Sequence, residues 1–361
     1  MVHYVLGDIV TEISERENNP SNSSYERFVG LKHYVSGEVE IDNYGSTSNL
    51  NSAMKVFKSG DILIARRNVY LKRASVVYFD GLTSGDSIVL RAKDETIGRI
   101  LPFILNTDDF WDYADQHSDG TMSKRLSPKV LKQYEFDLPE DNLEQFADIL
   151  WAMVDVKKSY QTLLKQTDEL VKSQFIEMFA DDEQGSLKDI ANIVMGQSPK
   201  GETYNDRGEG VPFYQGKTEF SDLYIGEPVM WTTSPTRFAQ TDDVLMSVRA
   251  PVGSTNIARE NCCIGRGLAA LQPIAGKSSS LFLIYAMRSI EADIDRMGVG
   301  STFKAINKEQ VHKIPVPITP IDKQDRFVEL AEQSDKSKFE LKQAIEGVDI
   351  LIKSLIQQEL N

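Results

Sequence analysis

The hexapeptide Asp168-Glu169-Leu170-Val171-Lys172-Ser173 returns 181 residues later as Asp349-Ile350-Leu351-Ile352-Lys353-Ser354. Three further matches have offsets between 180 and 182: Leu6-Gly7-Asp8-Ile9 with Leu187-Lys188-Asp189-Ile190, Asp61-Ile62-Leu63-Ile64 with Asp243-Val244-Leu245-Met246, and Gly120-Thr121 with Gly300-Ser301. A near-constant offset along 361 residues indicates two copies of one sequence unit. The repeat length suits one domain followed by a connector.

The end of each copy has the apolar periodicity of a long helix. The first stripe is Phe146, Ile149, Met153, Val156, Tyr160, Leu163, Thr167, Leu170 and Gln174, and the second is Phe327, Leu330, Ser334, Ser337, Leu341, Ala344, Val348, Leu351 and Leu355. Steps of three and four residues sustained over several heptads predict coiled-coil helices. Because such a stripe must be buried, we predict that the two helices pair antiparallel. The alternative is that each helix packs on its own module.

The earlier part of each copy is typical of a mixed α/β domain. Apolar runs at 61–65, 88–90, 244–248 and 267–271 predict strands, and 280–289 predicts a helix. The predicted fold class is therefore α+β (mixed α/β): two pseudo-symmetric globular domains separated by two long antiparallel coiled-coil helices. The predicted boundaries are 1–140 for module 1, 141–180 for a central helix, 181–320 for module 2 and 321–361 for a C-terminal helix.

Composition and missing motifs exclude several classes of protein. The chain has 40 Lys+Arg against 54 Asp+Glu, a formal charge of −14, which argues against a basic nucleic-acid coat protein and an anionic membrane partner. No apolar stretch approaches the ~20 residues of a membrane span, and no signal peptide is evident. The adjacent Cys262 and Cys263 indicate a reducing cytoplasm. Scattered histidines predict no metal site, and the absence of nucleotide-binding and methyltransferase motifs predicts a binder with no catalytic residue.

The basic residues gather in one stretch per copy. Residues 62–79 contain no acid, and residues 244–290 contain one acid among five basic residues. Segments that combine Arg and Lys with Asn, Gln and aromatic residues are typical of contacts with phosphates and base edges. The alternative is a solvated face that acids nearby in space neutralise, and composition leaves both interpretations open.

A resemblance to a known family decides between them. The carriers in the second copy are Met195-Gly196-Gln197-Ser198-Pro199-Lys200-Gly201-Glu202-Thr203-Tyr204-Asn205, Pro212-Phe213-Tyr214-Gln215-Gly216-Lys217, residues 243–253, Gly265-Arg266-Gly267 and Gly300-Ser301-Thr302-Phe303-Lys304. The first copy carries Phe28-Val29-Gly30-Leu31, residues 60–68, Leu71-Lys72-Arg73-Ala74 and Ser84-Gly85-Asp86. Together these motifs resemble the specificity subunits of Type I restriction-modification enzymes, whose two target-recognition domains alternate with two helices.

The resemblance implies a non-catalytic subunit that reads double-stranded DNA. Each domain is expected to read one half of a split target, while the helices set the spacer and dock two modification subunits. Those partners would hold S-adenosylmethionine and methylate adenine, and restriction subunits would join for cleavage. Because Gly196-Gln197-Ser198-Pro199 aligns with the dissimilar Glu15-Arg16-Glu17-Asn18, the two half-sites are expected to differ. The alternatives are a two-module protein-binding adaptor and a specificity subunit of a related, non-Type I system.

The candidate site residues follow from the basic stretches and the matched motifs. The DNA-binding candidates are Arg66, Arg67, Asn68, Lys72 and Arg73 in module 1, and Gln197, Ser198, Lys200, Tyr204, Gln215, Lys217, Arg249, Arg266 and Lys304 in module 2. Side chains predicted to lie off the helix seam and to face the modification subunits are Trp151, Phe175, Phe179, Ile352 and Ile356.

Overall fold

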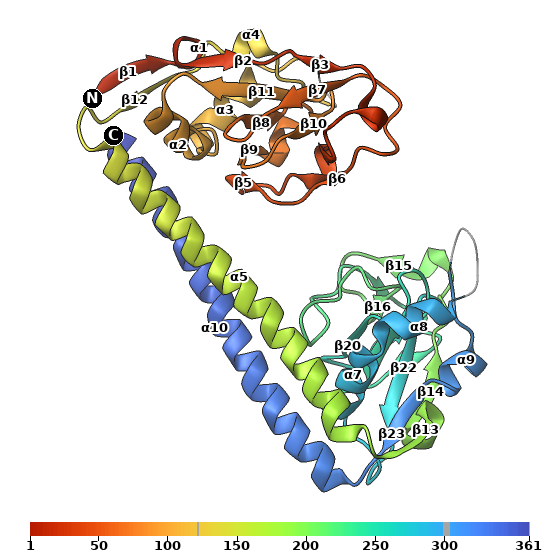
Figure 1. Ribbon diagram of the computed structural model, residues 1–361. Helices are drawn as coiled ribbons and strands as arrows, with labels where there is room; N and C mark the ends of the chain where they lie inside the picture. The colour runs from red at the N-terminus through yellow and green to blue at the C-terminus, as the bar shows by residue number, and fades with distance from the viewer. Residues whose placement is uncertain (121–122, 299–303, 361) are drawn as a thin grey trace. The chain divides into compact units, whose positions relative to one another are not determined.

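The computed structural model describes residues 1–120, 123–298 and 304–360, and the chain divides into two compact units. Unit 1 comprises Met1–Tyr160 with the C-terminal stretch from Ala344, and unit 2 comprises Gln161–Gln343. Each unit therefore contains one module and a portion of each long helix, α5 (Leu143–Phe179) and α10 (Ile321–Leu360). The fold is mixed α/β with two long helices, as the sequence predicts (Figure 1).

Unit 1 builds its module from three sheets of strand orders β1-β12, β2-β11-β8-β9-β5 and β3-β7-β10-β4-β6. Its elements are β1 (Val2–Val5), α1 (Leu6–Ile9), β2 (Val10–Glu12), β3 (Arg16–Glu17), β4 (Arg27–Val29), β5 (Glu40–Ile41), β6 (Gly45–Ser46), β7 (Met54–Phe57), β8 (Ile62–Ala65), β9 (Ala74–Val77), β10 (Gly81–Thr83), β11 (Ser87–Ala92), α2 (Glu95–Ile104), α3 (Asp108–Gln116), α4 (Pro128–Leu131) and β12 (Glu135–Leu138), with 3-10 turns at 20–22, 31–33 and 69–71. The main apolar core lies between the β8-containing sheet and helices α2 and α3.

Unit 2 repeats this plan with sheets β13-β23, β14-β22-β19-β20 and β15-β17-β16-β21-β18. Its elements are β13 (Glu183–Ser186), α6 (Leu187–Ile190), β14 (Ala191–Met195), β15 (Tyr204–Asn205), β16 (Val211–Tyr214), β17 (Trp231–Thr232), β18 (Phe238–Ala239), β19 (Val244–Ser247), β20 (Thr255–Ile257), β21 (Cys262–Ile264), β22 (Leu268–Pro273), α7 (Ser280–Ser289), α8 (Glu291–Met297), α9 (Lys308–His312) and β23 (Pro315–Ile318), with a 3-10 turn at 201–203. Equivalent strands in the two units also pair in the same register. Ala65 of β8 faces Ser87 of β11 in unit 1, and Ser247 of β19 faces Leu268 of β22 in unit 2.

A buried aspartate directly precedes β8 in unit 1 and β19 in unit 2. Asp61 is fully buried and accepts hydrogen bonds from the backbone of Lys58 at 2.8 Å and from the Arg91 guanidinium at 2.7 and 2.8 Å. Asp243 accepts from the backbone of Gln240 and from the Gln272 side chain. The same position therefore has a charged partner in unit 1 and a neutral partner in unit 2.

Portions of α5 and α10 pair within each unit. In unit 1, Lys157 of α5 contacts Asp349 of α10 at 2.8 Å. In unit 2, Lys338 of α10 contacts Asp168 of α5 at 2.9 Å, and the rings of Phe175 and Phe327 lie 5.2 Å apart. Because α5 residues increase in number as their α10 partners decrease, the pairing in unit 2 is antiparallel.

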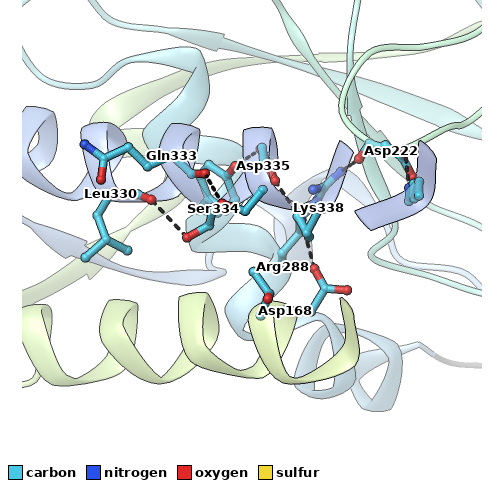
Figure 2. A network of polar contacts seen from close by, with 12 residues as sticks. Asp168, Asp222, Arg288, Leu330, Gln333, Ser334, Asp335 and Lys338 are labelled. Atoms are coloured by element: carbon cyan, nitrogen blue, oxygen red, sulfur yellow. Dashed lines mark hydrogen bonds and ion pairs between the residues drawn. The ribbon is translucent and has the colours of Figure 1, made fainter. Parts of the chain in front are cut away.

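A polar network fastens α10 to module 2. Lys338 lies between Asp168 and Asp335, as Figure 2 shows, and its side chain is only 17% exposed. Tyr285 of α7 donates to Asp335, while Arg288 of α7 donates to the backbone carbonyl of Asp222. The helix pair and the module in unit 2 therefore share a polar network in which Lys338 and Asp335 are partly buried and Asp168 is exposed.

The predicted stripe of α5 is buried only in part. Phe146 of the stripe is 7% exposed and belongs to the unit 1 core, whereas the stripe residues Ile149, Val156, Leu163 and Leu170 are 42–53% exposed. The residues one position after these exposed ones, among them Leu150, Lys157 and Val171, are buried instead. One residue rotates a helix by about 100°, so this half of the stripe was assigned to the neighbouring apolar face. The helix itself and its pairing are as predicted.

Burial overturns the expected exposure of three of the five side chains predicted to face the modification subunits. Phe175, Phe179 and Ile356 are at most 5% exposed and belong to the unit cores. Ile352 is half-buried against the unit 1 core, and the Trp151 indole donates to the carbonyl of Arg99 at 3.0 Å. These side chains hold the helices to their modules because aromatic and branched apolar groups gain most from burial.

Candidate nucleic-acid interface

In module 2, three separate segments meet at the end of β16 and β21. Gln197 donates its backbone N–H to Ile264 at 2.9 Å, and the backbone of Arg266 donates to the Ser198 hydroxyl at 3.3 Å. The carbonyl of Gln215 accepts from the backbone of Gly267 at 3.2 Å. Four of the predicted DNA contacts, Gln197, Ser198, Gln215 and Arg266, therefore belong to one cluster of loops.

Glycine makes this close approach possible. A Cβ atom at Gly196 would lie 2.1 Å from the carbonyl oxygen of Gly265, and one at Gly267 would lie 2.5 Å from that of Gln215. Both distances are shorter than any side chain tolerates, so the motif glycines are needed for the loops to touch. The strand beneath contains Cys262, whose burial raises the thiol pKa to about 12 and leaves it protonated at neutral pH.

Arg249 joins the same edge through the backbone. Val248 donates to the carbonyl of Gly267 at 2.9 Å, which places the next residue, Arg249, beside the Gly265–Gly267 turn. In the described part of the chain, neither Arg249 nor Arg266 contacts a carboxylate, and both side chains are exposed. Two unpaired guanidiniums at one edge suit the recognition of phosphate or guanine.

The remaining candidates of module 2 differ in their contacts and in their exposure. Lys304 is paired with Asp295 at 3.0 Å, and Lys217 lies 3.4 Å from the Ser254 hydroxyl. Lys200 is 85% exposed on the loop after Gln197, whereas the Tyr204 hydroxyl donates to the carbonyl of Pro199 and braces that loop. In the motif Gly300-Ser301-Thr302-Phe303-Lys304, residues 300–303 lie outside the described residues.

Arg237 was missed by sequence reasoning and belongs to this cluster. Its carbonyl accepts from Ile264, and its neighbour Thr236 donates to the carbonyl of Gln197. The Arg237 side chain is exposed and contacts no carboxylate among the residues that the structure describes. Arg237 lies before the acid-poor stretch 244–290, so only its position in the folded module identifies it as a candidate.

In module 1 the candidates divide into inward and outward side chains. Arg73 is 9% exposed and donates to the carbonyls of Leu31 and Arg67, so it braces the inside of the module. Burial lowers the pKa of Arg66, whose Nε donates to the carbonyl of Leu126 at 3.2 Å. Lys72 pairs with Asp108 at 2.5 Å.

Asn68 has a positive φ of 55° and accepts at its side-chain oxygen from the Ser123 hydroxyl. The left-handed backbone turns the chain directly after Arg67, and asparagine is one of the few residues that tolerate this conformation. The Asn68 side chain therefore stabilises this turn, in addition to any contact that it makes outside the chain.

Arg67 is held at the edge by an ion pair that has no counterpart in module 2. Its Nε contacts Oδ1 of Asp86 at 2.9 Å, and the same oxygen accepts from Nη2 of Arg125 at 2.9 Å. Arg125 was also missed from the sequence, although it lies only four residues after the repeat match at Gly120-Thr121. The two modules thus present arginines at equivalent edges with different surroundings.

The chain is similar to known proteins in sequence and in fold. Residues 181–347 match the model of the Type I restriction modification DNA specificity domain. A solved structure concerned with complex assembly and conformational transition of the type I R-M system contains a chain that is 27% identical, with a TM-score of 0.62, and the match covers 100% of this chain and 97% of that one. Residues 181–347 are thus similar to a Type I DNA specificity domain, and the whole chain is similar to a chain of a type I R-M structure.

Two further proteins are similar to this chain, one in sequence over part of its length and one in fold. A protein named as the type I restriction enzyme MjaX specificity subunit of Methanocaldococcus jannaschii is 45% identical over 132 residues, which are 37% of this chain and 31% of that protein. The match thus spans about a third of the curated relative. The S subunit from M. genitalium is 13% identical with a TM-score of 0.52 over 100% of this chain and 96% of its own, and it shares the fold. Among the residues that the structure describes, no helix is long and apolar enough to span a membrane.

Proposed function

We propose that this specificity subunit reads a bipartite DNA target, one half with each module. The observation that carries the proposal is the equivalence of the two edges. Arg67 in module 1 and Arg249 in module 2 follow the matched strands β8 and β19, and each forms an isolated backbone bridge, to Arg125 and to Ala305 respectively. Equivalent edges on two modules suit two half-sites, and exposed arginines suit base edges and phosphates.

The target is asymmetric in this proposal. Module 1 offers Arg67, Asp86 and Arg125, whereas the equivalent positions of module 2 hold Arg249, Gly267 and Ala305. Different donor sets select different bases, because guanine, cytosine, adenine and thymine present distinct patterns in the major groove.

The two helices are proposed to set the unread spacer and to dock two modification subunits. The exposed apolar residues of α5, such as Ile149 and Leu170, and Phe339 of α10 offer surface for such contacts. The modification subunits would bind S-adenosylmethionine and methylate adenine, and restriction subunits would add cleavage. The chain itself contributes no catalytic group in this proposal.

The proposal is tested by producing the subunit with the methyltransferase encoded beside it and mapping the methylated sites. A bipartite, non-palindromic methylation motif is expected, and a palindromic motif would overturn the asymmetry. Arg249→Ala should weaken binding to the specific duplex by a factor of about ten or more, because a good bidentate contact contributes ~1–3 kcal/mol.

The matched control is Lys188→Ala, which removes one positive charge from an exposed side chain of α6 in the same module. It should leave the ratio of specific to random binding unchanged. Equal losses on specific and random duplexes for Arg249→Ala would assign that residue to phosphate contact or folding. If no methylation motif is found, the assignment of DNA reading to this chain fails.

A further inference from the structure

Asp86 lies at the centre of the DNA-facing edge of module 1 and joins two arginines. Its Oδ1 forms an ion pair with Arg67 Nε at 2.9 Å and accepts a hydrogen bond from Arg125 Nη2 at 2.9 Å. The Asp86 side chain is 25% exposed, whereas those of Arg67 and Arg125 are 48% and 42% exposed. The carboxylate therefore lies beneath the two guanidiniums and leaves their outer nitrogens toward solvent.

The backbone fixes all three residues directly. Arg66 donates its backbone N–H to the carbonyl of Asp86, and Leu126 donates to the carbonyl of Arg66, both at 2.9 Å. Arg67 and Arg125 are also paired in an isolated β-bridge. The contact thus differs from an ordinary surface ion pair, where two long side chains must lose their freedom to meet.

Module 2 has the same backbone pattern without the carboxylate. Val248 donates to the carbonyl of Gly267, and Ile306 donates to the carbonyl of Val248. Gly267 occupies the position of Asp86, and a Cβ atom there would lie 2.5 Å from the carbonyl oxygen of Gln215. Packing in module 2 therefore forbids an acidic residue at this position, whereas module 1 accommodates one.

We propose that Asp86 is a positioning residue that orients Arg67 and Arg125 for sequence-specific contact with the first half-site. This inference rests on the proposed DNA-reading function. The carboxylate occupies one donor of each guanidinium and leaves both terminal nitrogens of Arg67 and one of Arg125 for DNA. It also cancels one positive charge, so the edge attracts random DNA less strongly.

A guanidinium that is already oriented loses less freedom when it forms paired hydrogen bonds with a base. Asp86 therefore raises the affinity of module 1 for the specific sequence and lowers its affinity for random DNA. Removing the charge should move these two quantities in opposite directions, which a residue with a purely structural role would not do.

The test compares Asp86→Asn with wild type in the complete complex with modification subunits. Binding is measured on the duplex that carries the mapped motif and on duplexes in which either half-site is scrambled. Asp86→Asn should reduce discrimination at the first half-site about tenfold, within the range of a lost bidentate contact. Discrimination at the second half-site should not change, and this measurement verifies folding and assembly. The slope of log K against log salt should steepen by up to about 0.9, one additional phosphate contact.

Asp80→Asn is the matched control, because Asp80 also pairs with a cation of module 1, Lys58 at 2.8 Å. Asp80→Asn should alter discrimination at neither half-site. Asp86→Glu should retain part of the discrimination that Asp86→Asn loses at the first half-site. Unchanged discrimination in Asp86→Asn, or an equal change in Asp80→Asn, would overturn the inference while the proposed function stands. A wild-type complex that recognises no sequence would overturn both.

Discussion

Replacing Asp61 with asparagine tests how a buried charge supports module 1. Asp61 is 0% exposed, and its carboxylate accepts three hydrogen bonds, two of them from Arg91. Asparagine retains one carbonyl oxygen but replaces the other acceptor with an amide that would point N–H groups at donors. Each hydrogen bond to a charged group contributes about 1.5–3 kcal/mol.

The Arg91 side chain is 46% exposed, so water screens part of the ion pair and can solvate the guanidinium after the change. We therefore take the loss of about one charge-assisted hydrogen bond and expect Asp61→Asn to lower the free energy of unfolding of unit 1 by about 2–3 kcal/mol. The full cost of ~3–5 kcal/mol for breaking a fully buried pair should not be reached.

Urea denaturation monitored by tryptophan fluorescence measures this change. Trp111 and Trp151 report on unit 1, so a Trp231→Phe background removes the tryptophan of unit 2. The midpoint should fall with little change in the denaturant slope, which indicates a change in stability rather than in compactness. Asp243→Asn, measured in a background that retains Trp231, is the matched control in unit 2, and it should cost less because its side-chain partner, Gln272, is neutral and can rotate its amide. A loss below about 0.5 kcal/mol for Asp61→Asn, typical of a surface change, would refute the reasoning.

Three further predictions concern unit 2. Phe327→Ala should cost about 3–5 kcal/mol of unit 2 stability, measured by Trp231 fluorescence, because the ring is fully buried; a cost below ~1 kcal/mol would contradict this packing. Lys338→Met should cost about 1–2 kcal/mol by leaving Asp335, whose side chain is 24% exposed, without its cation, and a double-mutant cycle with Asp335→Asn should give a coupling above zero. Burial raises the pKa of Asp243, so the folded state binds a proton more tightly than the unfolded state. Stability should therefore fall as pH rises from the unfolded value of 3.8 through the raised folded pKa, and Asp243→Asn should remove that fall in pH-dependent denaturation; parallel curves for the variant and wild type would refute it.

The duplication and the two long helices were readable from the sequence. A constant offset between matched segments requires no knowledge of contacts, because homologous copies fold alike. Regular apolar spacing similarly predicted α5 and α10, since 3.6 residues per turn place such residues along one side of a helix. The short strands β8, β11, β19 and β22 were predicted from another local pattern, apolar runs bounded by glycine or charge.

The tertiary structure decided which face of each helix is buried and which arginines reach the surface. Two apolar stripes lie side by side on α5, and only the packing of the module and of α10 selects the one that carries Leu150 rather than Ile149. Arg73 and Arg67 are six residues apart in one basic stretch, yet one points into the module and the other outward. Asp86 and Arg125 become partners only because β11 and the segment before α4 meet beside β8. Periodicity is a local property of the chain, whereas burial and charge pairing depend on residues brought together from distant positions.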